Sequence, residues 1–442
     1  MQNAPQISIP EIISLIQEES YAAIGMDKAS VHAFFQKEKN RITKFQKERP
    51  DYLKSREEIL AEDSSLHYME LDLARRFDTE VFSPFQHPYL YSWLKDVWRY
   101  HCEKLYGTEK ILDKEILLAT APSGRFNAMA LAGSKEHGIL FEDGLINVIV
   151  GISNNIAFLL YDKLDNGQYL EKTLEEIEPY SQKFPELLHN ISTIIYDYVV
   201  GGYSHAPPPF SDAHQDDFSI RTLISSACWS FIFEHELYHL KVHDGIQLWQ
   251  NQDFLDKRYG QVWKFFNQNL LPVLPLKIEE TEFKKRYLAH QEELFADYFA
   301  LHAVAKLGDI EGIRRPNILG VLSFFLIAEL TEHLILKLTE PGTLESFSTA
   351  DGLTISLTAI LMNESHPYAF ARRKGLFDGA KIYIGGLDDE LSILMEKMEL
   401  LLNLLKKQIN GKLLENEEGI EVHSKWTKSK EITAKHLHNR GK

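Results

Sequence analysis

The sequence contains very little cysteine, no excess of basic residues and no long apolar run. Two cysteines, Cys102 and Cys228, are too few for a disulfide framework or a thiolate zinc site, which indicates a reducing compartment. Lys and Arg number 48 against 64 Asp and Glu, so the formal net charge is −16. Because phosphate binding needs a basic face, this balance argues against a general nucleic-acid or anionic-membrane binder.

Signals for secretion and for membrane insertion are also missing. The opening residues, MQNAPQISIPEIISLIQEES, have no basic segment that leads into an apolar core, so a secretion signal is not expected. In the most apolar segment, 317–338, the uninterrupted apolar run extends only from Ile318 to Ala328, and Glu329 follows it. A bilayer needs about 20 apolar residues. We therefore expect a buried core helix here, no membrane span and a cytoplasmic protein.

The rest of the chain predicts an α+β fold that is predominantly helical and contains a small sheet. From about residue 115, short apolar runs broken by turn residues predict strands, followed by a helix near Leu145. We expect an N-terminal helical region at 1–112, a main domain at 113–410 and a polar, disordered tail at 411–442. Helical patterns cover 153–200, 219–243, 285–307, 317–338, 350–363 and 386–409.

One predicted helix contains the stretch FIFEHELYHLKVHDG, residues 231–245. His235 and His239 are four residues apart, so both rings project from one helix face. Imidazole nitrogen suits zinc, and two such ligands with one carboxylate leave a fourth position for water. Glu236, next to the first histidine, is placed to act on that water as a general base, as in the H-E-x-x-H pattern.

This helix has other possible interpretations. The polar residues could lie on an exposed face, but the neighbouring run Phe231–Phe233 indicates a packed helix, where histidines without partners are costly. A metzincin site needs a third histidine ten positions after the first, and that position is Gly245. His243 lies about 80° round the helix from His235, which favours a role at the border of the site or on the surface.

The third ligand is expected in LAHQEELFADYFALHAV, residues 288–304. Glu293 and Asp297 are four apart on an otherwise apolar helix, and two carboxylates on such a face need a cation or hydrogen-bond donors. We expect Glu293 to complete a site for one zinc ion per chain. Asp297 would then accept the remote N–H of a ligand histidine and fix its tautomer. Glu292 fits a solvated acidic stripe.

A second metal site is a further alternative, in the loop at 201–219. The loop contains His205, His214, Asp216 and Asp217. Its glycines and three consecutive prolines favour a mobile lid or a plain acidic loop instead.

These motifs resemble the gluzincin metallopeptidases of the HtpX, Oma and CaaX-prenyl-protease group. HELYH followed by EELFAD is similar to the group's zinc helices, and SHPYAFARRKGL, residues 365–376, is similar to its H-P-x-x-x-x-R segment. A further similarity, to a strand and the helix start after it, lies in residues 126–146. The positions that match outside the zinc helices are Asn127, Ala128, Gly144, Leu145, His366, Pro367 and Arg372. The matches lie in four short segments between about residues 120 and 380, and these follow one another in the same order as in the family.

The sequence departs from that group in two ways. Its members usually have membrane-spanning helices, and the insertion before the zinc helix is long here. The chain also resembles the Lit-type phage-exclusion peptidases, another cytosolic H-E-x-x-H group. We therefore carry over the catalytic machinery and not the membrane substrates.

The resemblance implies a zincin-like domain and a role for each matched residue. His366 would donate to the oxyanion, although it also fits a helix start before Pro367. Arg372 would order carboxylates such as Asp297. The strand Ala128-Met129-Ala130 would pair with an extended substrate backbone.

The resulting hypothesis is a soluble zinc endopeptidase that hydrolyses intracellular protein or peptide, in stress or phage-defence proteolysis. The rival is a non-catalytic, zinc-stabilised peptide-binding or regulatory module. Glu236 favours the enzyme, because structural zinc sites usually close all four positions with ligands. Hydrolysis of a non-peptide amide remains a further alternative.

Overall fold

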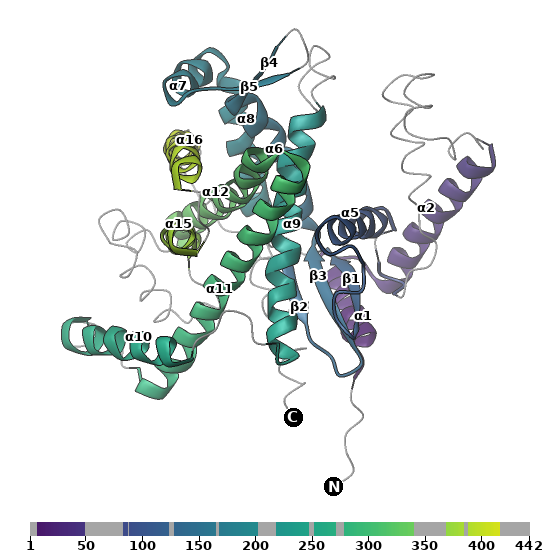
Figure 1. Cartoon of the computed structure of the whole chain (residues 1–442). Coiled ribbons are helices and arrows are strands. Elements are labelled where there is room, and N and C mark those ends of the chain that lie inside the picture. Colours follow the sequence, from purple (N-terminus) through teal and green to yellow (C-terminus); the bar gives the residue numbers. More distant parts are fainter. Residues whose placement is uncertain are drawn as a thin grey trace. The chain divides into compact units, whose positions relative to one another are not determined.

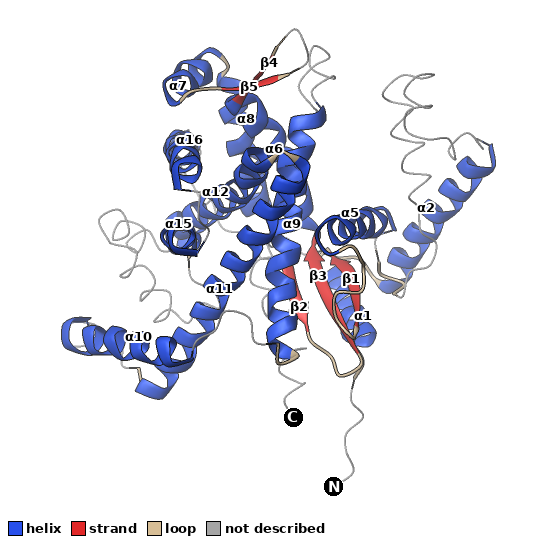
Figure 2. Ribbon diagram, viewed as in Figure 1, coloured by secondary structure: helices blue, strands red, loops and turns tan. Residues whose placement is uncertain are grey.

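The computed structural model describes residues 7–48, 83–86, 88–122, 128–164, 168–201, 218–246, 252–270, 278–339, 368–383 and 388–415. Most of these residues are helical, with one three-stranded sheet and one two-stranded hairpin (Figures 1 and 2). The expected α+β, predominantly helical class is confirmed. The chain forms two compact units that divide between Ile146 and Asn147. The domain boundaries predicted from the sequence stay a prediction.

The first unit contains a small mixed sheet. Strand β1 (Glu115–Ala121) runs parallel to β3 (Glu136–Glu142), and β2 (Ala128–Leu131) pairs with β3 in the antiparallel direction, so the order is β1-β3-β2. Helix α6 (Asp143–Leu160) begins directly after β3, close to the predicted start near Leu145. Among the described residues, this unit also contains helices α1 (Ile9–Ala23), α2 (Lys28–Glu48) and α5 (Pro88–Tyr106).

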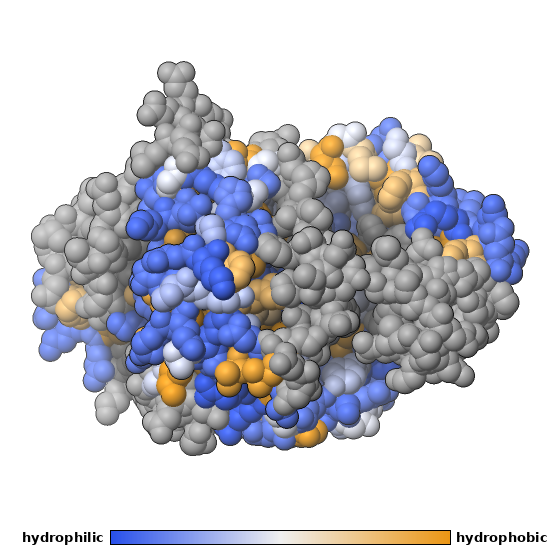
Figure 3. Space-filling model, turned by 90° about the horizontal axis from the view of Figure 1, so that it is seen from above, coloured by the Kyte–Doolittle hydropathy of each residue, from blue (hydrophilic) through white to orange (hydrophobic). Residues whose placement is uncertain are grey.

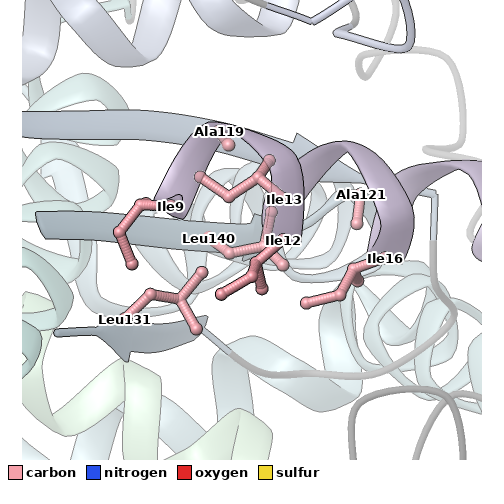
Figure 4. Packing of buried hydrophobic residues seen from close by; sticks show 8 residues of the cluster. All are labelled: Ile9, Ile12, Ile13, Ile16, Ala119, Ala121, Leu131 and Leu140. Carbon is pink, nitrogen blue, oxygen red and sulfur yellow. The ribbon is translucent and has the colours of Figure 1, made fainter. Parts of the chain in front are cut away.

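Helix α1 covers one face of this sheet. Ser8 and Glu11 form a capping box, in which the Ser8 N–H donates to Oε2 of Glu11 at 2.8 Å and the Glu11 N–H donates to Oγ of Ser8 at 3.4 Å. Figure 4 shows the isoleucines of α1 pointing at sheet residues: Ile9, Ile12, Ile13 and Ile16 meet Ala119, Ala121, Leu131 and Leu140. Each buried isoleucine contributes about 1.5–3 kcal/mol.

The second unit is built mainly from helices. Its hairpin, β4 (Tyr161–Lys163) with β5 (Tyr169–Glu171), interrupts the region 153–200 that was predicted to be helical, because three-residue strands are too short to show a pattern. The other elements are α7 (Leu174–Lys183), α8 (Pro185–Tyr196), η2 (Asp197–Gly201), α9 (Phe218–His243), α10 (Gln252–Phe265), η4 (Phe266–Leu270), α11 (Glu280–Glu311), α12 (Arg314–Thr339), α15 (Ala369–Tyr383) and α16 (Asp388–Glu415). Residues 411–415, predicted to begin a disordered tail, form the end of α16. The predicted helix at 350–363 lies outside the described residues.

Helices α9, α11 and α12 pack against one another (Figure 1). Gly320 lets α12 approach α9 closely, because a Cβ atom there would lie 2.4 Å from the Ala227 Cβ and 2.6 Å from the Ile224 carbonyl oxygen. Gly245, two residues after the end of α9, stops the helix with a left-handed φ of +77°. The Ile246 N–H donates to the Lys241 carbonyl oxygen at 3.0 Å, as in a Schellman cap.

Two of the described helices, α6 and α12, are long and apolar enough to cross a membrane. In each case about seven tenths of the most apolar window is buried inside the protein (71% and 72%), as in core helices of water-soluble proteins. On the face seen in Figure 3, described hydrophilic residues predominate and hydrophobic ones form small separate groups. The predicted absence of a membrane span stays a prediction.

Candidate metal centre

Three side chains from two helices of the second unit converge. The Nε2 atoms of His235 and His239, both on α9, lie 3.3 Å apart. Glu293 on α11 places Oε2 3.3 Å from the first nitrogen and Oε1 3.4 Å from the second. One ligand atom from each residue lies within 4.8 Å of the others. Because the chain turns by one helical turn between the histidines, α9 supplies both imidazoles from one face.

The other ring nitrogen of His235 contacts Asp297. Nδ1 of His235 lies 3.0 Å from Oδ1 of Asp297, whose side chain is completely buried. Arg372, on α15, donates two hydrogen bonds to the same carboxylate, from Nε to Oδ2 at 2.9 Å and from Nη2 to Oδ1 at 2.6 Å. The residue types predicted the contact of Asp297 with a ligand histidine, and the family resemblance implied that of Arg372 with Asp297. The structure brings the three side chains together.

Burial and charge shift the pKa values of His235 and Asp297 in opposite directions. Burial by itself lowers the pKa of His235, but hydrogen bonds and charge from Asp297 and Glu293 outweigh burial and raise it to about 10. Burial by itself raises the pKa of Asp297, but the guanidinium of Arg372, together with His235, holds it below its ordinary value. Binding of a metal ion at Nε2 of His235 would require that nitrogen to be free of a proton.

Glu292 contacts the second histidine. Its Oε1 lies 3.0 Å from Nδ1 of His239, and its side chain is 39% exposed. The sequence pattern favours a solvated acidic stripe for Glu292 and does not predict this contact. No spacing within α11 predicts this contact, because it depends on how α9 and α11 pack against each other.

Helix α15, which supplies Arg372, is fixed by further charged groups. The backbone N–H of its first residue, Ala369, donates to both carboxylate oxygens of Glu332, at 2.8 and 3.0 Å. The next arginine, Arg373, binds Glu329 of α12 and, at 2.8 Å, Glu399 of α16. The two consecutive arginines thus bind different partners. Arg372 binds Asp297 beside the converging group, and Arg373 binds glutamates of α12 and α16.

The remaining predicted residues are placed as follows. Glu236 is buried on α9, with 7% of its surface exposed. His243 is exposed at the end of that helix, 3.5 Å from Asp244, and does not belong to the converging group. Ala128, Met129 and Ala130 form the start of β2 in the first unit. His366, Pro367, Asn127 and the histidines and aspartates of the 201–219 loop lie outside the described residues.

The donor set fits a zinc ion. Two neutral imidazole nitrogens and one carboxylate match a three-ligand zinc site, which leaves a fourth position for water. Both Nε2 atoms face the carboxylate of Glu293, whereas both Nδ1 atoms face other carboxylates, and this fixes which nitrogen is free to bind. The described residues thus support a metal-binding His235–His239–Glu293 group.

Comparison of the chain with protein-family models, with curated proteins and with solved structures gave no match. The assignment of a metal-binding group therefore rests on the geometry of these side chains.

Proposed function

We propose that this protein is a zinc-dependent endopeptidase of the zincin type that hydrolyses peptide bonds of intracellular protein in the cytoplasm. The observation that carries the proposal is the convergence of both Nε2 atoms of an H-E-x-x-H helix on a carboxylate from a second helix. The motif order shared with the HtpX, Oma and CaaX-prenyl-protease group supports the same assignment. An intact Glu236 inside the motif favours hydrolysis over a structural site.

His235, His239 and Glu293 would hold the ion. When bound, zinc supplies a Lewis acid and lowers the pKa of a water molecule to about 7. Glu236 accepts a proton on its carboxylate from the attacking water and returns it to the leaving amine as a general acid. Its burial on the first turn after His235 keeps bulk water from competing for that proton.

Asp297 and Arg372 support this chemistry from behind His235. The carboxylate of Asp297 lies 3.0 Å from Nδ1 of His235, where it would favour the tautomer that presents Nε2 to the ion. Arg372 neutralises the buried carboxylate and holds it in place through two hydrogen bonds. His366 stays the proposed oxyanion donor on the strength of the resemblance.

Strand β2 is proposed to bind the substrate backbone. It lies at one end of the sheet order, so within the described part of the chain only one of its edges is paired. An extended peptide could pair with the second edge through main-chain hydrogen bonds, with little dependence on side-chain sequence.

The test replaces Glu236 by Gln, which removes the base and leaves the three ligands. We expect bound zinc to be unchanged, while cleavage of a reduced, carboxymethylated protein falls by about 10²–10⁴-fold. Glu282→Gln, at an exposed glutamate of α11, is the matched control and should cleave like the wild type. Retained zinc with undiminished cleavage would contradict the assigned mechanism. Zinc binding with no cleavage by the wild type would favour the non-catalytic module.

A further inference from the structure

The environment of His239 contains a carboxylate for which the H-E-x-x-H chemistry gives no role. Oε1 of Glu292 lies 3.0 Å from Nδ1 of His239, which is hydrogen-bond distance. Nε2 of the same ring lies 3.4 Å from Oε1 of Glu293. Because a carboxylate only accepts, Nδ1 must carry the hydrogen, and Nε2 then has the lone pair that a metal needs.

This contact repeats the one at the other histidine. Asp297 faces Nδ1 of His235 at the same distance of 3.0 Å. The two carboxylates lie on either side of Glu293 along α11, so a single helix supplies the third ligand and one acceptor for each imidazole. The two acceptors differ in setting. Asp297 is completely buried and bound by Arg372, whereas the Glu292 side chain is 39% exposed.

We propose that Glu292 is a positioning residue for the metal centre. It fixes the tautomer and the orientation of His239, and its negative charge makes Nε2 of that ring a stronger ligand. The proposal rests on the metal-binding role given to the centre in the proposed function. It adds a second anchored imidazole to the one anchored by Asp297, and it assigns Glu292 a role that does not require contact with the substrate.

Because the side chain of Glu292 is partly exposed, it can be replaced without disturbing the core. Truncation of a partly exposed side chain leaves no buried cavity, so the fold should not depend on it. Gln291, the preceding residue of α11, has similar exposure and serves as the matched control. Glu292→Gln keeps an oxygen acceptor in the same position without the charge.

The experiment measures zinc dissociation constants of the full chain by competition with a chromophoric chelator. We expect Glu292→Ala to weaken zinc binding by about 10–100-fold, Glu292→Gln to recover part of the loss, and Gln291→Ala to match the wild type. The absorption spectrum of the Co²⁺-loaded protein should change in Glu292→Ala and stay unchanged in Gln291→Ala. Only the first substitution removes a group that contacts a ligand, His239.

Equal zinc affinities and equal Co²⁺ spectra for Glu292→Ala and the wild type would overturn the proposal, even if the protein proves to be a zinc peptidase. Failure of the metal centre itself has a different result: the wild type would then bind zinc no better than His239→Ala. Thermal unfolding of each metal-free variant shows whether the fold is intact, and equal midpoints are expected.

Discussion

Oδ1 of Asp297 lies 3.0 Å from Nδ1 of His235, and the same carboxylate accepts two hydrogen bonds from Arg372. The three groups form a buried charged row that ends at the metal centre. A helix distant in sequence, α15, therefore contributes to the geometry of the H-E-x-x-H helix. This arrangement lets stability and metal affinity be separated experimentally.

Arg372→Ala should affect both properties. It leaves the completely buried Asp297 without its guanidinium, which should cost about 3–5 kcal/mol in the free energy of unfolding. Zinc affinity should fall by about 10-fold or more, because the acceptor of His235 is no longer fixed. Urea unfolding and chelator competition measure the two effects.

Arg373→Ala is the matched control for that variant. Arg373 binds Glu329 and Glu399 and contacts no residue of the converging group in the described structure. It should lower the free energy of unfolding while zinc affinity stays as in the wild type. Equal losses of zinc affinity in the two variants would mean that α15 acts on the site only through general stability.

Removal of the metal should destabilise the protein. A ligand present at 100 times its dissociation constant adds about 2.7 kcal/mol to the free energy of unfolding, so a chelator should lower the unfolding temperature of the zinc-loaded chain. In His235→Ala and in Glu293→Ala the chelator should have no effect. His302→Ala, at an exposed histidine of α11, should behave like the wild type. Metal content by atomic emission gives the stoichiometry, expected to be one zinc per chain.

Asp143 should make stability depend on pH. Burial, and then the charge of Glu142, raise the pKa of Asp143 to about 8 from an ordinary value of 3.8, against a hydrogen bond with Thr120 that lowers it. The folded state therefore keeps a proton that the unfolded state releases above pH 4. The stability that Asp143 contributes is complete below about pH 4 and is lost as the pH rises to about 8.

The measurement compares the free energy of unfolding of the wild type and Asp143→Asn between pH 5 and pH 8. For one proton the wild type should lose at most ~1.4 kcal/mol per pH unit relative to the variant, which has no such group. A difference between the two proteins that does not change with pH would mean that Asp143 ionises normally.

Gly320→Ala should separate α9 from α12. The added methyl would lie 2.4 Å from the Ala227 Cβ and 2.6 Å from the Ile224 carbonyl oxygen, so the helices must move apart. A cost of about 1–3 kcal/mol in the free energy of unfolding is expected. Gly411→Ala is the control, because a Cβ on that helical glycine meets nothing within 4 Å. It should be neutral or stabilise by up to about 1 kcal/mol. Equal effects of the two substitutions would contradict the close-approach argument.

The sequence predicted the parts of the molecule that depend on local pattern. It predicted helix 219–243, found as Phe218–His243, and the convergence of His235, His239 and Glu293, because i,i+4 spacing fixes which side chains share a face. It also placed strands between 115 and 145. The parallel pairing of β1 with β3 was not predicted, since register depends on packing between segments rather than on either segment.

The contact between Glu292 and His239 is an example of what the sequence did not predict. In the sequence Glu292 is one of four consecutive polar residues, His290–Glu293, before an apolar run, which is typical of a solvated face. Its contact with His239 depends on the antiparallel approach of α9 and α11, which no pattern within either helix records. The β4–β5 hairpin was missed for a related reason, because strands of three residues are too short for an alternation to appear.

The six-residue stretch Glu292–Asp297 of α11 carries the third ligand and an acceptor for each imidazole. The geometry of the centre thus depends mainly on how α9 and α11 are aligned along their axes, while α15 adds Arg372 behind Asp297. If α11 shifted along its axis by one residue, about 1.5 Å, Glu292, Glu293 and Asp297 would all move away from the two histidines together. The third ligand and both acceptors therefore depend together on the position of α11 along α9.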